Sequence, residues 1–134
     1  MPMTTEQRDA FLRETRIAKL ATLNADGSPN IVPVWFEWDG EVARVFTSKG
    51  SPKVNRIEAD PRVALSVEEP VGAAEAWVTI EGSCTLTTEG TPELIARLAR
   101  RYYAPEQAEK SISEWLARDI WVTLEIRPGR IKSY

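Results

Sequence analysis

The residues best suited to chemistry lie in one short segment, Phe46 to Lys53, where a predicted strand ends and a predicted helix begins. Gly50 lets the backbone approach a ligand closely, and the first helical turn has unpaired N–H groups and a partial positive charge. Lys49, Ser51 and Lys53 add two cations and a hydroxyl at the same place. Phosphate groups are bound by donors of these kinds, so the segment predicts a phosphate-binding site.

A purely structural interpretation explains the same residues. Ser51 and Pro52 are residue types that commonly begin a helix, and the two lysines would then be solvated. Pro52 also has no N–H group, which leaves fewer backbone donors for an anion. The sequence pattern alone leaves both interpretations open.

The chain contains no histidine, which removes the commonest general base and the commonest metal ligand. Triad hydrolases and ordinary zinc or haem sites are therefore disfavoured, and we predict neither a catalytic side chain nor a metal site. Cys84 is the single cysteine, so no disulfide forms within the chain, and it lies in a predicted strand without a neighbouring cation. A short chain with five tryptophans and no histidine is expected to borrow its chemistry from a bound cofactor.

The charge balance argues against a nucleic-acid partner. The 134 residues carry 17 Lys and Arg against 20 Asp and Glu, and no block of basic residues is present. No apolar run approaches the roughly 20 residues that a membrane span needs. The length fits a single domain over residues 1–134, and we expect a cytoplasmic protein with a small-molecule substrate.

The elements that must position the phosphate segment are mostly strands. Alternating apolar residues predict strands at 17–23, 30–38, 42–47, 62–67, 76–86, 120–126 and 130–134. Start signals and helical spacing predict helices that begin near Thr4 and span 51–59, 94–103 and 106–118. The basic-aromatic stretch Arg97 to Tyr103 is interpreted as the solvated face of its helix. Six or seven strands with short helices predict a mainly β, antiparallel small barrel.

Three sequence features predict local irregularities. The first three strands form a predicted meander, and Pro33 inside the second of them cannot donate to a ladder, so it should lie at an edge, at a bulge or against a ligand. Gly82 predicts a bulge in a long strand. Pro128 and Gly129 predict a turn before the last short strand.

From about Arg16 to the C-terminus, the chain resembles the pyridoxamine 5′-phosphate oxidase-like superfamily of flavin-binding split barrels. The resemblance rests on the order and spacing of several short motifs: Leu20-Ala21-Thr22-Leu23, Asp26-Gly27-Ser28-Pro29, Pro33-Val34-Trp35-Phe36, Phe46 to Lys53, Asp60 to Leu65, Val78 to Gly82, and Pro128 to Tyr134. No single motif among them is specific.

The resemblance implies a homodimer of split barrels, with FMN or, alternatively, the deazaflavin coenzyme F420 in grooves between the subunits. It places the cofactor ring along the backbone from Val32 to Glu37 and the phosphate at Ser51 and Lys53. Trp77 falls where the family places a polar contact to the ring, Tyr134 falls where it often has an aromatic residue that closes the site, and both could come from the partner subunit. The full set of expected cofactor-binding residues is Pro33, Val34, Trp35, Phe46, Thr47, Ser48, Lys49, Ser51, Lys53, Trp77 and Tyr134.

Some residues of this chain depart from the motifs of the superfamily and narrow the range of expected activities. True pyridoxamine 5′-phosphate oxidases of this superfamily have cationic side chains at the positions of Val32, Glu37 and Pro52, so this chain is not expected to be one. Lys49 could compensate for a missing cation, and a relaxed phosphate site would suit the diester of F420. The leading expectation is an oxidoreductase that transfers hydride to or from a small substrate. The alternatives are a flavin-binding protein without turnover and an interaction module that has lost the cofactor.

Overall fold

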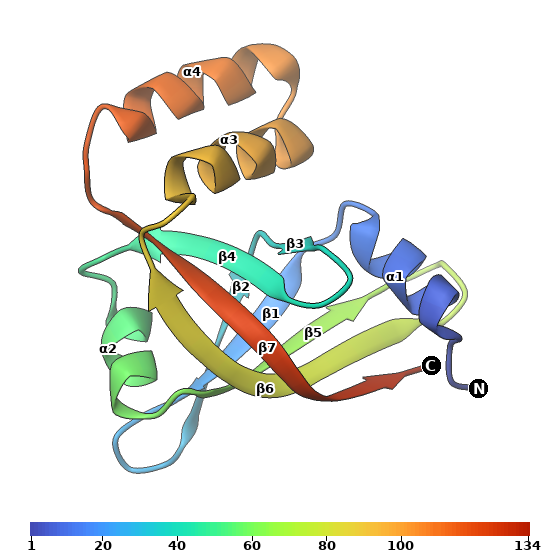
Figure 1. The fold of residues 1–134 in the computed structure, drawn as a ribbon. Coiled ribbons are helices and arrows are strands. Elements are labelled where there is room, and N and C mark those ends of the chain that lie inside the picture. The colour runs from blue at the N-terminus through green and yellow to red at the C-terminus, as the bar shows by residue number, and fades with distance from the viewer.

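The computed structural model describes residues 1–134 and has four helices and seven strands (Figure 1). The helices are α1 (Thr5–Arg13), α2 (Pro52–Ala59), α3 (Thr91–Tyr102) and α4 (Pro105–Leu116). The strands are β1 (Ala18–Leu23), β2 (Pro29–Val34), β3 (Glu37–Trp38), β4 (Ala43–Ser48), β5 (Arg62–Glu68), β6 (Trp77–Thr87) and β7 (Trp121–Ser133). None of the helices is long and apolar enough to cross a membrane.

All seven strands belong to one antiparallel sheet in the order β2-β1-β5-β6-β7-β4-β3. β2 and β3 lie at opposite edges of this sheet, yet only Trp35 and Phe36 separate them along the chain. Two residues span only a short distance, so the two edges must lie close together and the sheet must curl. The result is the half-open barrel in Figure 1, which confirms the predicted mainly β, antiparallel split-barrel fold.

The predicted meander is wrong in one respect. The expected strand 30–38 breaks at Trp35 and Phe36, and β4 pairs with β3 and β7 instead of β2. The Phe36 side chain is fully buried, so the chain turns inward there and cannot continue a flat ladder. Pro33 is at the predicted place: β2 is an edge strand that pairs only with β1, where Pro33 lies opposite Lys19.

The predicted bulge is confirmed and the predicted turn is wrong. The ladder between β6 and β7 shifts register between Glu81 and Gly82. The two strands approach so closely there that a Cβ atom at Gly82 would lie 2.0 Å from the carbonyl oxygen of Arg127, so only glycine fits. β7 runs without a turn through Pro128 and Gly129, and the bulge absorbs the irregularity that this dipeptide creates.

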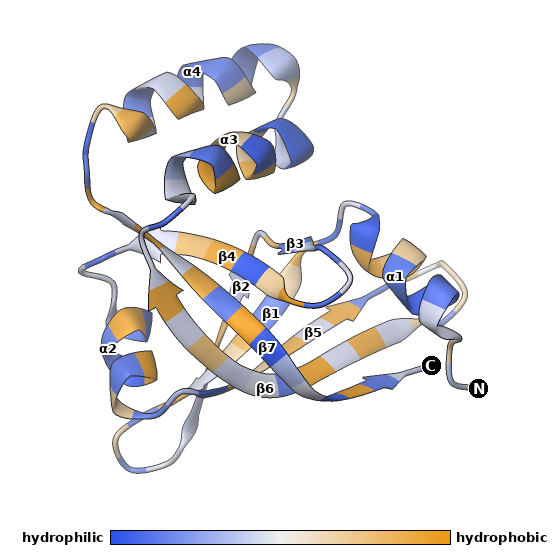
Figure 2. Ribbon diagram, in the orientation of Figure 1, coloured by the Kyte–Doolittle hydropathy of each residue, from blue (hydrophilic) through white to orange (hydrophobic).

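The core lies inside the curl of the sheet. Alternate residues of the strands point inward, as the banding of β6 and β7 in Figure 2 illustrates, and the fully buried ones include Leu20, Leu65, Ile80 and Leu124. Each such side chain contributes roughly 1.5–3 kcal/mol through its removal from water. The α1 helix adds Phe11 and Leu12 to the same cluster.

The α3–α4 hairpin packs on the sheet through α3, against β4 and β7. Its arginines do not all face solvent as predicted. Arg97 and Arg100 form exposed ion pairs with Glu37 and Glu109, but the Arg101 guanidinium donates to the carbonyl oxygens of residues 12, 13 and 14 at 3.2, 2.7 and 2.7 Å. Those carbonyls end α1 and lack helical partners, so Arg101 fastens one helix to the other.

Candidate functional site

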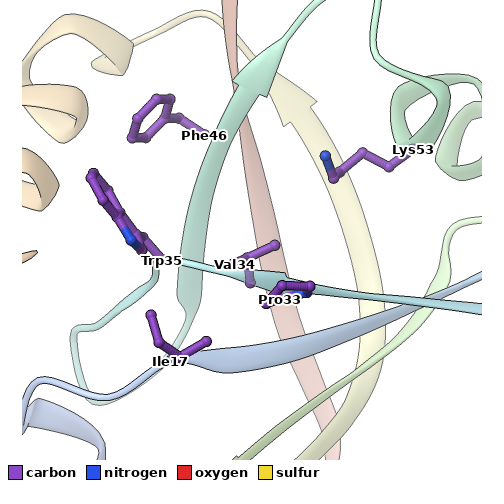
Figure 3. Close-up of a pocket in the computed structure, with 6 residues that line it drawn as sticks. All are labelled: Ile17, Pro33, Val34, Trp35, Phe46 and Lys53. Atoms are coloured by element: carbon purple, nitrogen blue, oxygen red, sulfur yellow. The ribbon is translucent and has the colours of Figure 1, made fainter. Parts of the chain in front are cut away.

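The sheet leaves a groove beside its β2 edge. The groove has a volume of about 470 Å³, within the range of small-molecule sites. Six residues from β2, β4, α2 and the segments flanking β1 and β2 line it (Figure 3): Ile17, Pro33, Val34, Trp35, Phe46 and Lys53. Lys53 lies at one side and Trp35 with Phe46 at another, so the groove joins a charged region to an aromatic one.

Lys53 and two hydroxyl groups form the cationic end of the groove. The Lys53 ammonium donates to Thr47 Oγ1 at 3.3 Å, and the Thr47 hydroxyl donates to Ser51 Oγ at 3.1 Å. Ser51 is the N-cap of α2 but makes no side-chain capping bond, so its hydroxyl is committed to this network instead. Burial lowers the pKa of Lys53, and the neighbouring Arg56 lowers it further. An anion at this end would offset both unfavourable effects.

Arg56 was not among the predicted site residues. Its Nε–H donates to Thr22 Oγ1 at 2.8 Å, and an Nη2–H donates to Asn30 Oδ1 at 3.0 Å, so it ties α2 to β1 and β2. Arg56 follows Lys53 by three residues in a predicted helix, and that spacing places both cations on one helix face. The spacing was therefore a signal available in the sequence.

At the aromatic end of the groove, Trp35 and Phe46 belong to a cluster of six rings, whose other members are Tyr102, Tyr103, Trp115 and Trp121. Trp35 stacks on Tyr102 with ring centroids 4.9 Å apart and an interplanar angle of 3°. Tyr103 approaches Trp35 edge-on at 4.8 Å, and Trp115 lies 6.1 Å from it. The indole of Trp35 is thus fixed by rings from α3, α4 and the residue after α3.

Tyr102 anchors this ring cluster to the backbone. Its hydroxyl donates to the Arg16 carbonyl oxygen at 2.5 Å and accepts from the Phe36 N–H at 3.3 Å. The first bond reaches the segment before β1, and the second reaches the break between β2 and β3. Tyr102 therefore holds together the two chain segments that flank Trp35 and Ile17.

The predicted site residues fall into three groups. Five line the groove, namely Pro33, Val34, Trp35, Phe46 and Lys53. Thr47 and Ser51 join the Lys53 network, and the Ser48 carbonyl accepts from the Ser51 N–H at 3.0 Å. The others lie elsewhere: Lys49, Trp77 and Tyr134 are not among the residues lining the groove.

The places of these three residues explain their absence from the groove wall. The Lys49 ammonium is half exposed and lies 3.8 Å from the Asp119 carboxylate. Trp77 and Tyr134 begin β6 and follow β7, at the end of the sheet remote from α2 in Figure 1. Their rings stack 6.4 Å apart at 11°, and their backbones exchange two hydrogen bonds.

Cys84 has no part in the groove. Burial, together with the nearby Glu125 carboxylate, raises the pKa of its thiol to about 12. The thiol is therefore protonated at neutral pH and unreactive.

The groove fits a flat cofactor that carries a phosphate. Lys53 at one end and Arg56 on the same helix have only neutral hydrogen-bond partners, the Pro33 position offers no N–H to a further strand, and rings bound the other end. No carboxylate lines the groove, so nothing in its wall would repel an anionic group. The chemistry of these groups suits binding and orientation more than acid–base catalysis.

Comparison with known proteins gives the same picture. Residues 4–130 match the family model described as pyridoxamine 5′-phosphate oxidase. An F420H2-dependent biliverdin reductase of Mycobacterium tuberculosis is 38% identical over 100 residues, which cover 72% of this chain and 70% of that protein. This similarity supports an oxidoreductase with a flavin-type cofactor.

Two solved structures extend the comparison. A conserved hypothetical protein of Mycobacterium tuberculosis has a TM-score of 0.79 at 25% identity and covers 98% of this chain and 84% of its own. A structure described as an F420 reductase has a TM-score of 0.73 at 26% identity and covers 92% of this chain and 94% of its own.

Proposed function

The chain belongs to the pyridoxamine 5′-phosphate oxidase family, and from that premise we propose that it is a reductase that uses the deazaflavin coenzyme F420. The single observation that carries the proposal is the groove with a cationic end and an aromatic end. The similarity to an F420H2-dependent reductase favours F420 over FMN, which was the first expectation from the sequence. A diester phosphate also suits a site in which Pro52 stands where the family's oxidases have a cation.

When bound, a deazaflavin supplies hydride transfer at its ring, and the protein supplies position and a dry environment. Lys53 and the hydroxyls of Thr47 and Ser51, which already form one hydrogen-bond network, would hold the phosphate. The backbone edge of β2 at Pro33 and Val34 would face the ring, because Pro33 has no N–H that would be left without a partner there.

Trp35 and Phe46 bound the part of the groove next to the proposed ring site. Their rings exclude water there and offer an apolar surface to a second flat molecule. No lining residue other than Lys53 is titratable, so the groove wall would bind and orient the cofactor and a substrate and would offer them no carboxylate or thiol. We therefore propose a flat, conjugated substrate, and biliverdin, the substrate of the related reductase, is the first compound to assay.

We also propose that two copies of the chain form the complete site. β2 exposes Pro29, Ile31 and Pro33 on one face, with Ile31 64% exposed, and the stacked Trp77 and Tyr134 are also partly exposed. A second copy would cover these apolar groups and bring its aromatic pair to the groove. Light scattering should give twice the chain mass of 15.0 kDa, and Ile31→Lys should give a monomer that binds cofactor poorly. A monomeric wild-type protein would refute this part of the proposal.

The cofactor and the reaction can be tested in two steps. The purified protein is titrated with F420 and with FMN, and binding is followed by the fluorescence of Trp35 and its neighbours. The protein loaded with reduced F420 is then mixed with biliverdin, and loss of the reduced cofactor is followed by absorbance. We expect tighter binding of F420 and its oxidation only when substrate is present.

A flavin-binding protein without turnover is the second candidate, because no lining side chain is an acid or base suited to catalysis at neutral pH. Tight binding without oxidation of the reduced cofactor by any conjugated acceptor would favour this candidate. If neither cofactor bound at high concentration, both functions would be wrong.

A further inference from the structure

Arg56 is a half-buried cation without a counter-charge. Its two hydrogen-bond partners, Thr22 and Asn30, are neutral, and neither Arg56 nor Lys53 forms an ion pair. Other arginines of the chain, such as Arg44 and Arg97, pair with carboxylates. Two neighbouring cations that repel each other beside a groove form a site that an anion would stabilise.

The position of Arg56 continues the groove. Along β2, Asn30 and Val34 point to the same side of the strand, since side chains alternate and the two residues are four apart. Val34 lines the groove, and Asn30 accepts a hydrogen bond from Arg56. Four residues of strand span about 13 Å. The Arg56 guanidinium therefore lies on the same face of β2 as Val34, at the Asn30 end of the strand.

The guanidinium has donors to spare. An arginine side chain carries five N–H bonds. In Arg56, the one on Nε donates to Thr22 and one of the two on Nη2 donates to Asn30. The remaining N–H on Nη2 and both on Nη1 have no partner among the chain's hydrogen bonds. The hydrogen bonds to Thr22 and Asn30 already fix the orientation of the guanidinium. A phosphate oxygen could therefore accept from its unpaired N–H groups with little loss of side-chain entropy.

We infer that Arg56 is the second cation of an anion subsite that it shares with Lys53, and that this subsite takes the phosphate of the cofactor. The inference rests on the proposed function for the identity of the cofactor but not for the chemistry of the anion. Lys53 contacts the near side of the phosphate from the groove wall, and Arg56 contacts it from the β2 side. Lys49, which the sequence offered as the extra cation, lies beside Asp119 instead.

The decisive test compares ligands that differ only in the phosphate. Affinities of F420 and its phosphate-free deazaflavin, and of FMN and riboflavin, are measured for the wild type and for Arg56→Gln, Arg56→Lys and Arg62→Gln. Loss of a charged donor should weaken the phosphate-bearing ligand about 10- to 100-fold in Arg56→Gln and leave its phosphate-free partner unchanged. Arg56→Lys should restore part of the difference.

The control variant Arg62→Gln removes the same charge from a side chain that is 75% exposed and pairs with Asp60, and it should change neither affinity. A merely structural Arg56, which only ties α2 to the sheet, would weaken both ligands of a pair equally. That result, or an unchanged ratio of the two affinities, would overturn the inference.

A second measurement separates this inference from the proposed function. Inorganic phosphate is titrated into the protein without cofactor, and the Arg56 Nε–H resonance is followed by NMR against sodium chloride at equal ionic strength. We expect a phosphate-specific shift that is lost in Lys53→Ala. If cofactors bind but Arg56→Gln has no selective effect, only the inference is wrong; if phosphate binds and no cofactor does, only the proposed function is wrong.

Discussion

The two ends of the groove are assembled over very different distances in the sequence. At the cationic end, Thr47, Ser51 and Lys53 come from one stretch of seven residues that joins β4 to α2. At the aromatic end, rings that contact Trp35 come from α3, α4 and β4, up to eighty residues away. The first end depends on local geometry and the second on the whole tertiary structure, so mutations should affect them differently.

The largest effect is expected where the aromatic end is fastened to the rest of the protein. Arg101→Ala removes three hydrogen bonds to the end of α1 and a cation that lies 5.4 and 5.6 Å from the ring centroids of Phe36 and Tyr102. The free energy of unfolding should fall by about 3 kcal/mol. Urea unfolding followed by tryptophan fluorescence measures the loss.

Arg100→Ala is the matched control for this change. Arg100 is the preceding residue, and its exposed ion pair with Glu109 should contribute little to stability, because solvent screens it. Equal losses in the two variants would mean that Arg101 does not fasten the aromatic end.

A smaller effect, confined to ligand binding, is expected at the cationic end. Lys53→Ala should weaken a phosphate-bearing cofactor by about 2 kcal/mol, because a charge-assisted contact is lost. The fold should keep its stability, since the ammonium bonds only to Thr47 and faces the groove. Calorimetric titration measures the affinity, and Lys49→Ala, which removes an exposed lysine near Asp119, is the control. A similar loss of affinity in both variants would place the phosphate elsewhere.

These two changes also show how far the sequence could predict the site. Lys53 and Ser51 were predicted because a strand end, a glycine and a helix start are local signals. Tyr102 and Trp115 were missed because their spacing describes only a helix face, and nothing local says that this face meets Trp35. The same limit applies to Arg101. It was predicted to face solvent, and the prediction is wrong because its carbonyl partners lie more than eighty residues away in the sequence.

In the fold, too, local features could be predicted from the sequence and long-range contacts could not. The strands and helices were largely predicted, since each is a local pattern, and β4 does pair with the 37–38 end of the predicted strand 30–38, but its long pairing with β7 was not predicted. Pairing β4 with β7 closes the curl between segments nearly eighty residues apart, and no local signal specifies it. The break at Phe36 has a similar cause, because only the buried place of that ring in the tertiary structure requires it.

A still smaller effect on stability is expected from a single hydroxyl at the aromatic end. Tyr102→Phe keeps the ring stacked on Trp35 but loses the bonds to Arg16 and Phe36, so stability should fall by about 1 kcal/mol. Tyr103→Phe is the control, because the hydroxyl of Tyr103 makes no hydrogen bond in the structure and its loss should have almost no effect. Thermal unfolding of the three proteins compares them, and equal midpoints would show that the hydroxyl of Tyr102 does not anchor the cluster.

The smallest effect is a pH dependence that belongs to the cationic end alone. Burial and Arg56 lower the pKa of Lys53 from its ordinary value of 10.5, so the ammonium loses its proton at a lower pH than a solvated lysine does. Phosphate binding needs the charged form, so affinity should be constant between the second pKa of the phosphate, about 6, and the pKa of Lys53, and should decline as the pH rises through the latter. A bound phosphate itself favours the charged form of Lys53, which keeps the change small.

The ratio of FMN to riboflavin affinity isolates this effect, because titration of the shared ring cancels between the two ligands. The ratio should fall with rising pH for the wild type and stay level for Lys53→Arg, whose guanidinium remains protonated throughout. The aromatic end carries no titrating group that distinguishes the two ligands, so riboflavin alone should follow the same pH curve in both proteins. A wild-type ratio that stays constant up to the ordinary lysine pKa would show that Lys53 is better solvated than its place in the groove implies. The two ends of the groove would then not differ in their response to pH.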